Sequence, residues 1–144
     1  MDPTEKKTNF LKSYLANHGL KMTQQRQLIA QTFFETDDHL SISELYTEIK
    51  KKRSNIGFAT VYRTIKLFEE CGLAVPRHFG HGEAKYEQDF EVKHHDHLIC
   101  TGCGKIIEFH NRHIENLQDK IAQTHGFKLQ HHHHNLYGEC KNCQ

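Results

Sequence analysis

Residues 59 to 87 read ATVYRTIKLFEECGLAVPRHFGHGEAKYE, and this stretch decides the fold of the first half of the chain. Apolar side chains recur at helical spacing from Val61 through Ile65 to Phe68, and Gly72 provides a stop for the helix. Two short segments that mix apolar and polar residues follow, joined by Gly-His-Gly, which is typical of a two-stranded hairpin. A helix that leads into a small hairpin predicts a winged helix-turn-helix, with this helix sized for the major groove of DNA.

Three more helices are predicted before it. The first covers about 9–18, and the second begins after Thr23, which is a good N-cap. Ser41 and Glu44 form a capping-box pattern that starts the third helix. Four short helices and a hairpin therefore predict a winged-helix DNA-binding domain over residues 1–85.

The fourth helix carries polar side chains on the face opposite its apolar stripe. They are Thr60, Arg63, Thr64 and Lys66, with Tyr62 beside them. All of these side chains could reach phosphates or base edges. A solvated helix face would show the same pattern, so the pattern alone leaves DNA contact and solvent exposure as alternatives.

The second half follows a different pattern, β-β-α-β, over about 60 residues. The strand-like segments HDHLIC and GKIIEFH flank TGCG, Asn111 caps a helix, and FKLQHHHHNLY predicts a last strand. The helix is expected to turn Ile114, Leu117 and Ile121 inward and to stop at Gly126. A unit of this size has a small core, so a structural metal and dimerisation would both stabilise it. The predicted fold class is α+β, a winged helix followed by a small α/β dimerisation domain.

Length and composition limit the class of protein. With 144 residues, 36% hydrophobic and 26% charged, the chain has the composition of a soluble globular protein. No apolar run approaches the roughly 20 residues that span a bilayer, and the first residues lack an apolar signal core, so a cytoplasmic location is expected.

Residues 1–85 carry 13 Lys and Arg against 10 Asp and Glu, net +3, whereas residues 86–144 carry 6 against 8, net −2. The first part could face a polyanion and the second could face cations.

Four of the five cysteines form two CxxC pairs. The pairs are Cys100 with Cys103, and Cys140 with Cys143. In an intracellular protein this spacing indicates zinc rather than a disulfide, and four thiolates complete a closed tetrahedral site. The alternative is that the thiols are free. Cys71, on the fourth helix, is predicted to pack in the core.

Ten of the 14 histidines lie after residue 85. If 94–99 is a strand, His95 and His97 point to one face while His94 and Asp96 point to the other. One ion cannot easily use all four side chains, so the pleat predicts two metal sites. The candidate partners from elsewhere in the chain are His39, Glu87, Glu108, Glu115 and the histidines at 131–134. Nitrogen and carboxylate ligands without a thiolate suit Fe(II), Mn(II), Co(II) or Zn(II). The alternative for any single histidine is an ordinary surface or buried residue.

Over nearly its whole length the chain resembles the ferric uptake regulator family of metal-dependent bacterial repressors. The resemblance rests on GLKMTQQR (19–26), HLSISELY (39–46), ATVYRTIKLFEECG (59–72), HHDHLICTGCGKIIEF (94–109), and HGFKL with LYGEC (125–140). It implies a short hinge near 83–90 between the winged helix and a dimerisation domain over 91–144.

The resemblance also implies residue roles. The four CxxC cysteines match the family's structural zinc ligands. A regulatory site would contain His39, Glu87, His95, His97 and Glu108. A second site within the C-terminal domain would contain His94, Asp96, Glu115 and His132, the last chosen among four adjacent histidines by its spacing to Cys140. For DNA, Lys21 matches a lysine that enters the minor groove, Tyr62 and Arg63 match recognition-helix residues, and Thr60 joins them from the polar face.

The predicted function is therefore an Fe(II)-dependent repressor of iron-uptake genes, binding operator DNA as a homodimer or tetramer. Peroxide-sensing members tend to carry Asp where this chain has Glu108, and zinc-sensing members usually include a sensory cysteine. Both differences favour iron over peroxide or zinc sensing, and manganese sensing is a further alternative.

Two functions of other classes are weighed against this prediction. A metal-storage domain would explain the histidines but not the basic first half. A zinc-dependent deaminase would need the H-x-E piece at His81 and a Pro before Cys100, where Ile99 stands instead. It would also leave the second CxxC pair without a role, so the chain is predicted not to be an enzyme.

Overall fold

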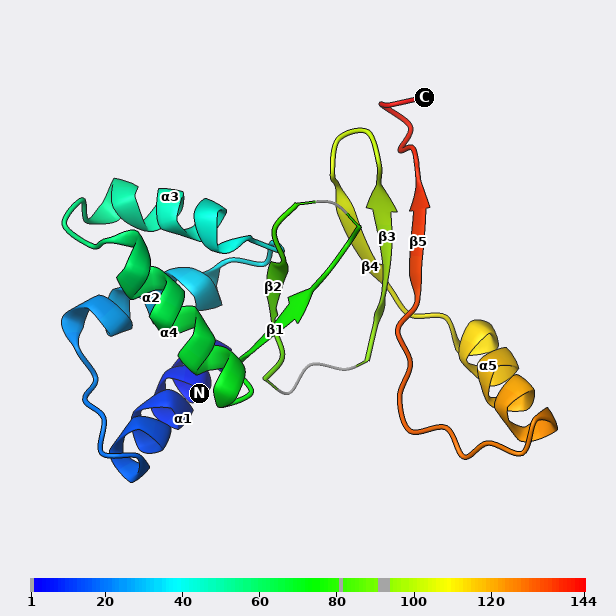
Figure 1. Cartoon of the computed structure of the whole chain (residues 1–144), viewed down its shortest axis with the longest axis horizontal. Coiled ribbons are helices and arrows are strands. Elements are labelled where there is room, and N and C mark those ends of the chain that lie inside the picture. The colour runs from blue at the N-terminus through cyan, green and yellow to red at the C-terminus, as the bar shows by residue number, and fades with distance from the viewer. Residues whose placement is uncertain (1, 81, 91–93) are drawn as a thin grey trace. The chain divides into compact units, whose positions relative to one another are not determined.

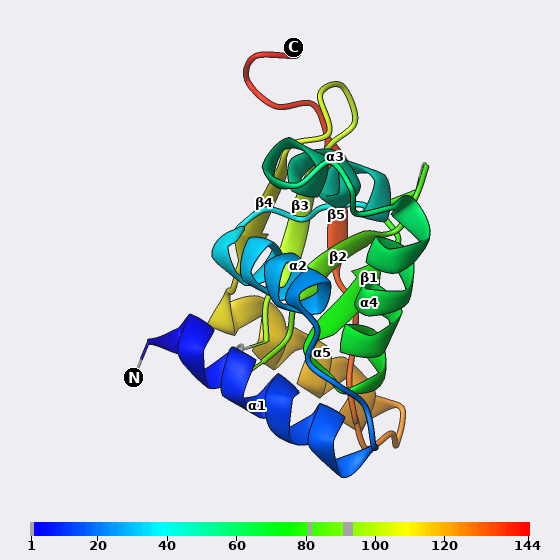
Figure 2. The same cartoon turned by 90° about the vertical axis from the view of Figure 1, so that its left-hand side faces the viewer.

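The computed structural model describes residues 2–80, 82–90 and 94–144, and it divides into two units, Met1–Val92 and Lys93–Gln144 (Figure 1). His81 and the predicted start of the second domain at residue 91 lie outside the described residues. The first unit contains α1 (Pro3–Asn17), α2 (Gln24–Glu35), α3 (Ile42–Lys52), α4 (Phe58–Glu70), β1 (Ala74–Arg77) and β2 (Lys85–Gln88). Figure 2 looks onto its four helices.

Local signals set the helix ends. The Thr23 hydroxyl accepts a hydrogen bond from Arg26 N at 3.1 Å, and the Ser41 hydroxyl accepts one from Glu44 N at 3.1 Å, as predicted. Gly72 has φ +81°, the left-handed conformation that ends α4. The first helix begins earlier than predicted, because Pro3 fits a first turn, where its missing N–H is not needed.

The core of the first unit lies between the four helices and the hairpin. Val61, Ile65 and Phe68 of α4 are fully buried, which confirms the predicted apolar stripe. The rings of Phe33, Phe34 and Phe68 pack with centroids 5.6–5.9 Å apart. Cys71 packs against this core as predicted, and burial raises the pKa of its thiol.

A backbone bridge from the segment before α3 extends the hairpin. β1 pairs antiparallel with β2, and Tyr86 of β2 forms an isolated antiparallel bridge with Leu40, just before α3. Glu87 lies within β2, in agreement with the predicted second segment of the hairpin. The hinge near 83–90, which the family resemblance implied, overlaps this strand.

The second unit contains β3 (Asp96–Cys100), β4 (Ile106–Phe109), α5 (Arg112–Thr124) and β5 (Asn135–Gly138), with sheet order β4-β3-β5. β3 pairs antiparallel with β4 and parallel with β5. The predicted last strand was too long, since 127–134 is not strand. The register joins His97 to Asn135, so ladder pairing with β3 begins only there.

The predicted inward face of α5 is also wrong for a single chain. The Asn111 side chain caps the helix as predicted, accepting from His113 N and Ile114 N. Leu117 and Ile121, however, are 58% and 61% exposed. The second unit has no core large enough to cover this face. Among the described residues, none of the helices combines the length and apolar character that crossing a bilayer requires.

Candidate metal centres and nucleic-acid interface

The four CxxC cysteines meet at one end of the sheet in the second unit. Cys100 ends β3, Cys103 lies in the turn toward β4, and the second pair follows β5. Their four sulfurs lie within 4.8 Å of one another, and Cys103 Sγ lies 3.8 Å from Cys140 Sγ. Sulfurs that share one zinc at about 2.3 Å lie about 3.8 Å apart in a tetrahedron. All five cysteines are free of disulfides, so this geometry fits a structural zinc site.

Backbone groups and a glycine shape this cluster. Cys103 N and Cys140 N both donate to Cys100 Sγ, at 3.4 and 3.3 Å, and these bonds lower the pKa of the Cys100 thiol to about 6. Hydrogen bonds among the sulfurs, first that with Cys140, raise the pKa of Cys143 to about 12. A Cβ atom at Gly102 would lie 2.9 Å from Cys143 Sγ. Only glycine therefore leaves room for the Cys143 side chain beside this turn.

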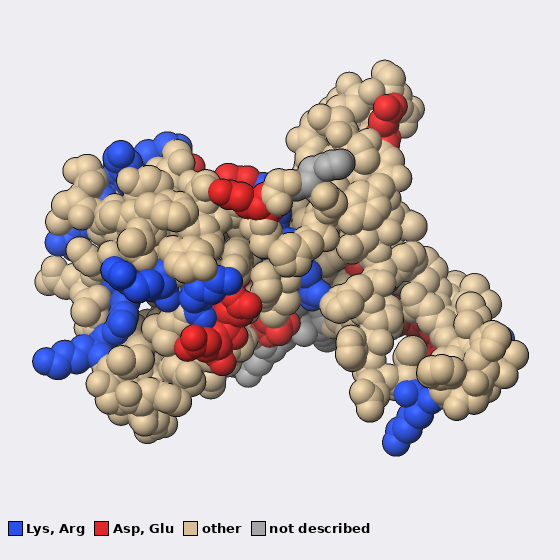
Figure 3. Space-filling view, viewed as in Figure 1, with Lys and Arg blue, Asp and Glu red and all other residues tan. Residues whose placement is uncertain are grey.

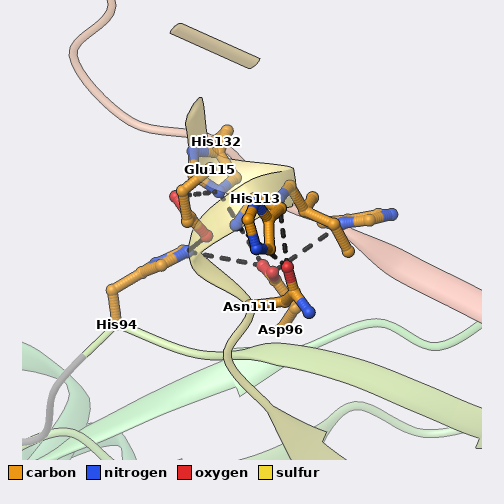
Figure 4. A network of polar contacts seen from close by, with 8 residues as sticks. His94, Asp96, Asn111, His113, Glu115 and His132 are labelled. Carbon is orange, nitrogen blue, oxygen red and sulfur yellow. Dashed lines mark hydrogen bonds and ion pairs between the residues drawn. The ribbon is translucent and has the colours of Figure 1, made fainter. Parts of the chain in front are cut away.

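A second cluster joins the start of β3 to α5 and to the segment before β5 (Figure 4). The structure brings together the set that the family resemblance implied: the candidate ligand atoms of His94, Asp96, Glu115 and His132 lie within 4.8 Å of one another. His94 Nε2 lies 3.3 Å from Asp96 Oδ1 and 3.2 Å from Glu115 Oε1. His132 Nε2 lies 3.4 Å from Glu115 Oε2.

The second cluster contains buried polar atoms without hydrogen-bond partners. Within the described part of the chain, both oxygens of Asp96, Glu115 Oε1 and His132 Nε2 are in this state. Buried polar atoms are nearly always satisfied, and a buried carboxylate needs a cation or a donor. The residues present therefore fit a divalent ion. His134 Nδ1, which the sequence reasoning did not select, lies 3.7 Å from Asp96 Oδ2 and is also buried without a partner.

The remaining predicted ligands of the second unit gather on the other side of β3. The rings of His95 and His97 lie 4.9 Å apart, and His95 Nε2 lies 3.5 Å from Glu108 Oε1. The register places Glu108 directly opposite His97, across the β3–β4 ladder. The predicted separation of His95 and His97 from His94 and Asp96 is therefore confirmed.

The first unit brings together the other two predicted regulatory ligands. His39 Nε2 lies 2.6 Å from Glu87 Oε2, and both side chains are 6% exposed. Arg77 Nε donates to Glu87 Oε1 at 2.8 Å, a contact that the sequence reasoning missed. Arg77 lies directly across the hairpin turn from Lys85, and its pairing with Glu87 depends on strand register rather than on any motif. Glu87 is thus a buried carboxylate held between a histidine and an arginine.

The candidate DNA-binding residues lie on and near α4. Tyr62 is 45% exposed, Arg63 and Lys21 are exposed, and Thr60 is half-buried. Arg26 Nη1 donates to Lys21 O at 2.6 Å and so fixes the loop before α2. In Figure 3, Lys and Arg side chains gather over the helices of the first unit.

Two polar residues of α4 differ from the sequence interpretation. Thr64 is 3% exposed and its hydroxyl donates to Thr60 O, so it does not lie on the open polar face. Helical geometry places it next to buried Ile65 and Val61, at the edge of the apolar stripe. Lys66 Nζ donates to Tyr86 Oη at 3.1 Å and lies 5.7 Å from the Tyr62 ring centroid. The hydrogen bond to Tyr86, followed by the one to Glu69 Oε2, raises the pKa of Lys66.

A family model described as the ferric uptake regulator family matches residues 17–137. The chain belongs to this family. The ferric uptake regulation protein of Campylobacter jejuni is 46% identical over 134 residues, which cover 92% of this chain and 85% of that protein. The family consists of metal-responsive transcriptional regulators.

Solved structures of the ferric uptake regulator family have the same fold. The Helicobacter pylori ferric uptake regulator, described with three functional metal binding sites, matches with a TM-score of 0.91 and 30% identity over 99% of this chain and 94% of that one. A zinc-bound manganese uptake regulator matches with a TM-score of 0.76 and 42% identity over 90% of this chain and 98% of that one. The α+β fold with an N-terminal winged helix is therefore confirmed.

Proposed function

We propose that this chain is an Fe(II)-dependent repressor that binds operator DNA near iron-uptake genes when the metal is bound. One observation carries the proposal. The first unit holds His39 against Glu87 with both side chains buried, and the second unit directs His95, His97 and Glu108 to one side of β3. We propose that these two sets of ligands, one from each unit, bind the same regulatory ion.

Such a shared ion would make the arrangement of the two units depend on metal. Binding of both ligand sets favours the arrangement in which they meet, and thereby shifts the population of the winged helix toward one placement. A shift from mostly one arrangement to mostly the other takes about 5 kcal/mol of differential binding. Several bonds between a divalent cation and histidine or carboxylate ligands are of that order.

The other two centres have supporting roles in the proposal. The four cysteines would hold a structural zinc that stabilises the second unit, because their sulfurs already have tetrahedral spacing. His94, Asp96, Glu115 and His132 would hold a second divalent ion. Their orphaned buried atoms are what supports this assignment.

The DNA-binding surface would be formed by α4 and the loop before α2. Tyr62, Arg63 and Thr60 are proposed to enter the major groove, and Lys21 to reach a neighbouring groove or phosphate. Two recognition helices presented by a homodimer would read two half-sites. The exposed apolar face of α5 supports dimerisation, because Leu117 and Ile121 need a partner surface.

The winged-helix fold and the family support a regulator in the cytoplasm, without catalytic activity. Both CxxC pairs converge on one cluster, which supports a structural role for these cysteines rather than the deaminase alternative. The ligand sets of nitrogen and carboxylate groups support iron, and so do the curated relatives named for ferric uptake. A second candidate is manganese, because a 42% identical structure is a manganese uptake regulator.

Operator binding titrated separately with Fe(II), Mn(II) and Zn(II) without oxygen would test the proposal. The DNA would be a duplex selected from random sequences by the metal-loaded protein. An iron-dependent repressor would be supported if DNA binding reached half its maximum at a lower free concentration of Fe(II) than of Mn(II) or Zn(II). This binding should also survive added peroxide. Stronger response to Mn(II), or loss of binding with peroxide, would assign the chain to one of the alternative classes.

A further inference from the structure

We infer that His134 is a further positioning residue of the second site, where its Nδ1–H orients Asp96 and does not bind the ion. The inference rests on the proposed function of that site as a metal centre. It concerns a residue outside the set His94, Asp96, Glu115 and His132, whose ligand atoms lie within 4.8 Å of one another.

The starting point is the burial of Asp96. This residue is 1% exposed, and within the part of the chain that the structure describes neither carboxylate oxygen has a hydrogen-bond partner. An ionised carboxylate accepts at both oxygens, and burying either one uncompensated is strongly unfavourable. An ion on one oxygen therefore leaves a second requirement, a donor for the other.

The two oxygens of Asp96 face different groups. Figure 4 shows Asp96 together with His94, Glu115 and His132. Oδ1 lies 3.3 Å from His94 Nε2 and 3.8 Å from His132 Nε2, so it belongs to the ligand set. Oδ2 lies 3.7 Å from His134 Nδ1. This asymmetry assigns Oδ1 to the ion and Oδ2 to His134.

His134 is held in place by its own contacts. Its carbonyl accepts from His97 N at 3.1 Å, at the point where β5 approaches β3, and its ring packs edge-on to Phe109 with centroids 6.0 Å apart. Its Nδ1 is buried and has no hydrogen-bond partner among the described residues. The distance to Oδ2 exceeds a typical N–H···O separation by about 0.8 Å. The inference requires this gap to close by side-chain rotation when the ion binds.

The chemistry of the pair favours a donor over a ligand. When His134 Nδ1–H bonds to Oδ2, Asp96 is fixed as a one-oxygen ligand whose second oxygen is neutralised in a buried site. Outer-shell hydrogen bonds of this kind orient metal ligands, and their loss costs about 10- to 100-fold in metal affinity. His134 would thereby set the affinity of the second site without occupying a coordination position.

The test uses the full-length, zinc-containing protein in a His95→Ala background, so that the regulatory set is impaired and the second site can be titrated. Co(II) is added without oxygen, and its d–d absorption reports both affinity and coordination. His134→Leu is expected to weaken Co(II) binding by about 10- to 100-fold. The saturated spectrum is expected to stay unchanged, because the ligands themselves are the same.

Three further variants make the result specific. His134→Asn places an amide N–H near the position of Nδ1 and is expected to restore most of the affinity. His134→Gln places its amide near the position of Nε2 and is expected not to. His133→Leu alters an exposed residue of the same histidine run and is the matched control, with affinity expected to be that of the background protein.

The outcomes separate the inference from the proposed site. If the background protein binds no Co(II), the second site itself is wrong and the inference falls with it. If it binds Co(II) and His134→Leu binds equally well, only the inference is overturned. A saturated spectrum in His134→Asn that shifts to lower coordination would make His134 a ligand and also overturn the inference. If His134→Leu does not fold, the comparison of Asn with Gln decides, and equal affinities for these two contradict the positioning role.

Discussion

Leu40 and Tyr86 exchange both of their backbone hydrogen bonds, with Tyr86 N 2.7 Å from Leu40 O and Leu40 N 3.3 Å from Tyr86 O. Each is the immediate neighbour of a candidate regulatory ligand, since His39 precedes Leu40 and Glu87 follows Tyr86. His39 and Glu87 are 48 positions apart in sequence, and this single bridge brings them together, with His39 Nε2 2.6 Å from Glu87 Oε2. This bridge is the main reason why the first unit presents His39 and Glu87 as a preformed pair of candidate ligands.

Substituting Glu87 with Gln should weaken the response to the regulatory metal. The amide keeps the shape of the side chain but removes the charge that faces Arg77 and His39. We expect the free metal concentration needed for DNA binding to rise by at least about 10- to 100-fold, since even outer-shell partners contribute that much. Anaerobic fluorescence anisotropy with the selected duplex measures it. Glu48→Gln, an exposed change on α3, should leave the titration unmoved, and an equal effect from both would rule out the assignment of Glu87.

Removing one zinc ligand should destabilise the second unit selectively. In Cys100→Ser the remaining three sulfurs no longer complete a closed site, and binding energy that supports folding is lost. Hydrogen exchange is expected to speed up in β3, β4 and β5 while α2 and α4 keep their protection. Cys71→Ser serves as the comparison, because Cys71 packs in the first unit and lies outside the cysteine cluster. Unchanged exchange in Cys100→Ser would exclude a structural zinc there.

The cysteine cluster should also show ordered thiol ionisation once zinc is removed with a chelator. The pKa of Cys100 is lowered to about 6 by hydrogen bonds from Cys103 N and Cys140 N, whereas that of Cys143 is raised to about 12. Iodoacetamide should therefore modify Cys100 before Cys143, with a rate that rises near pH 6, and should modify half-buried Cys71 slowly because the pKa of its thiol is raised. Mass spectrometry of peptides across pH 5 to 9, as an approximate range around these values, gives the order.

The sign of the linked stability change follows from the same shift. The folded pKa of Cys100 lies below its ordinary value of 9.0, so its ionisation contributes to stability fully above that value. The contribution is lost as the pH falls through about 6. A chelated protein whose unfolding midpoint did not fall across this window, relative to Cys100→Ser, would contradict the assignment.

Arg63 and Thr64 are adjacent on α4 but should behave differently in DNA binding. Arg63 is exposed, whereas Thr64 is buried with its hydroxyl on Thr60 O. Arg63→Ala should weaken operator binding, and if it contacts a phosphate the salt slope should fall by about one. Thr64→Val should leave operator affinity and the salt slope unchanged and alter only thermal stability. Affinity measured at several salt concentrations distinguishes the two variants, and a matching loss in both would place the DNA contact elsewhere.

The exposed apolar face of α5 should be required for self-association. Leu117→Glu introduces a charge into a face that we propose is covered by a second copy, so the dimer should dissociate at concentrations where the unaltered protein is dimeric. Sedimentation velocity reports the change. Asn116→Glu adds a charge one residue away, off the apolar stripe, and should keep the dimer. Dimers that persist in Leu117→Glu would move the interface to another surface.

The helices of the first unit were predictable because their signals are local. Thr23, Ser41 and Gly72 act within one turn of the chain, and the apolar stripe of α4 needs only helical periodicity. The grouping of His95 with His97 was predictable for the same reason, since strand alternation is a local rule.

The errors concern features that depend on partners distant in sequence. The contacts of Glu87 with His39 and Arg77 could not be predicted, because they depend on the register of β2 with β1 and on the bridge to Leu40. Thr64 was placed on the polar face because it lies at the edge of the apolar stripe of α4, where a small rotation of the helix decides whether a side chain is buried. The side chain of His134 could not be assigned to Asp96, since nothing in four consecutive histidines says which of them turns toward β3.

The parallel pairing of β3 with β5 has a consequence for how the protein is made. The first unit uses contacts within its own 92 residues and can fold as soon as they leave the ribosome. The second unit cannot, because its central strand β3 pairs with Asn135–Gly138, and Cys100 and Cys103 cluster with Cys140 and Cys143. A nascent chain stalled just before Cys140 would thus carry a folded winged helix attached to a second unit whose cysteine cluster is incomplete, and the cluster could form only after Cys143 has been added.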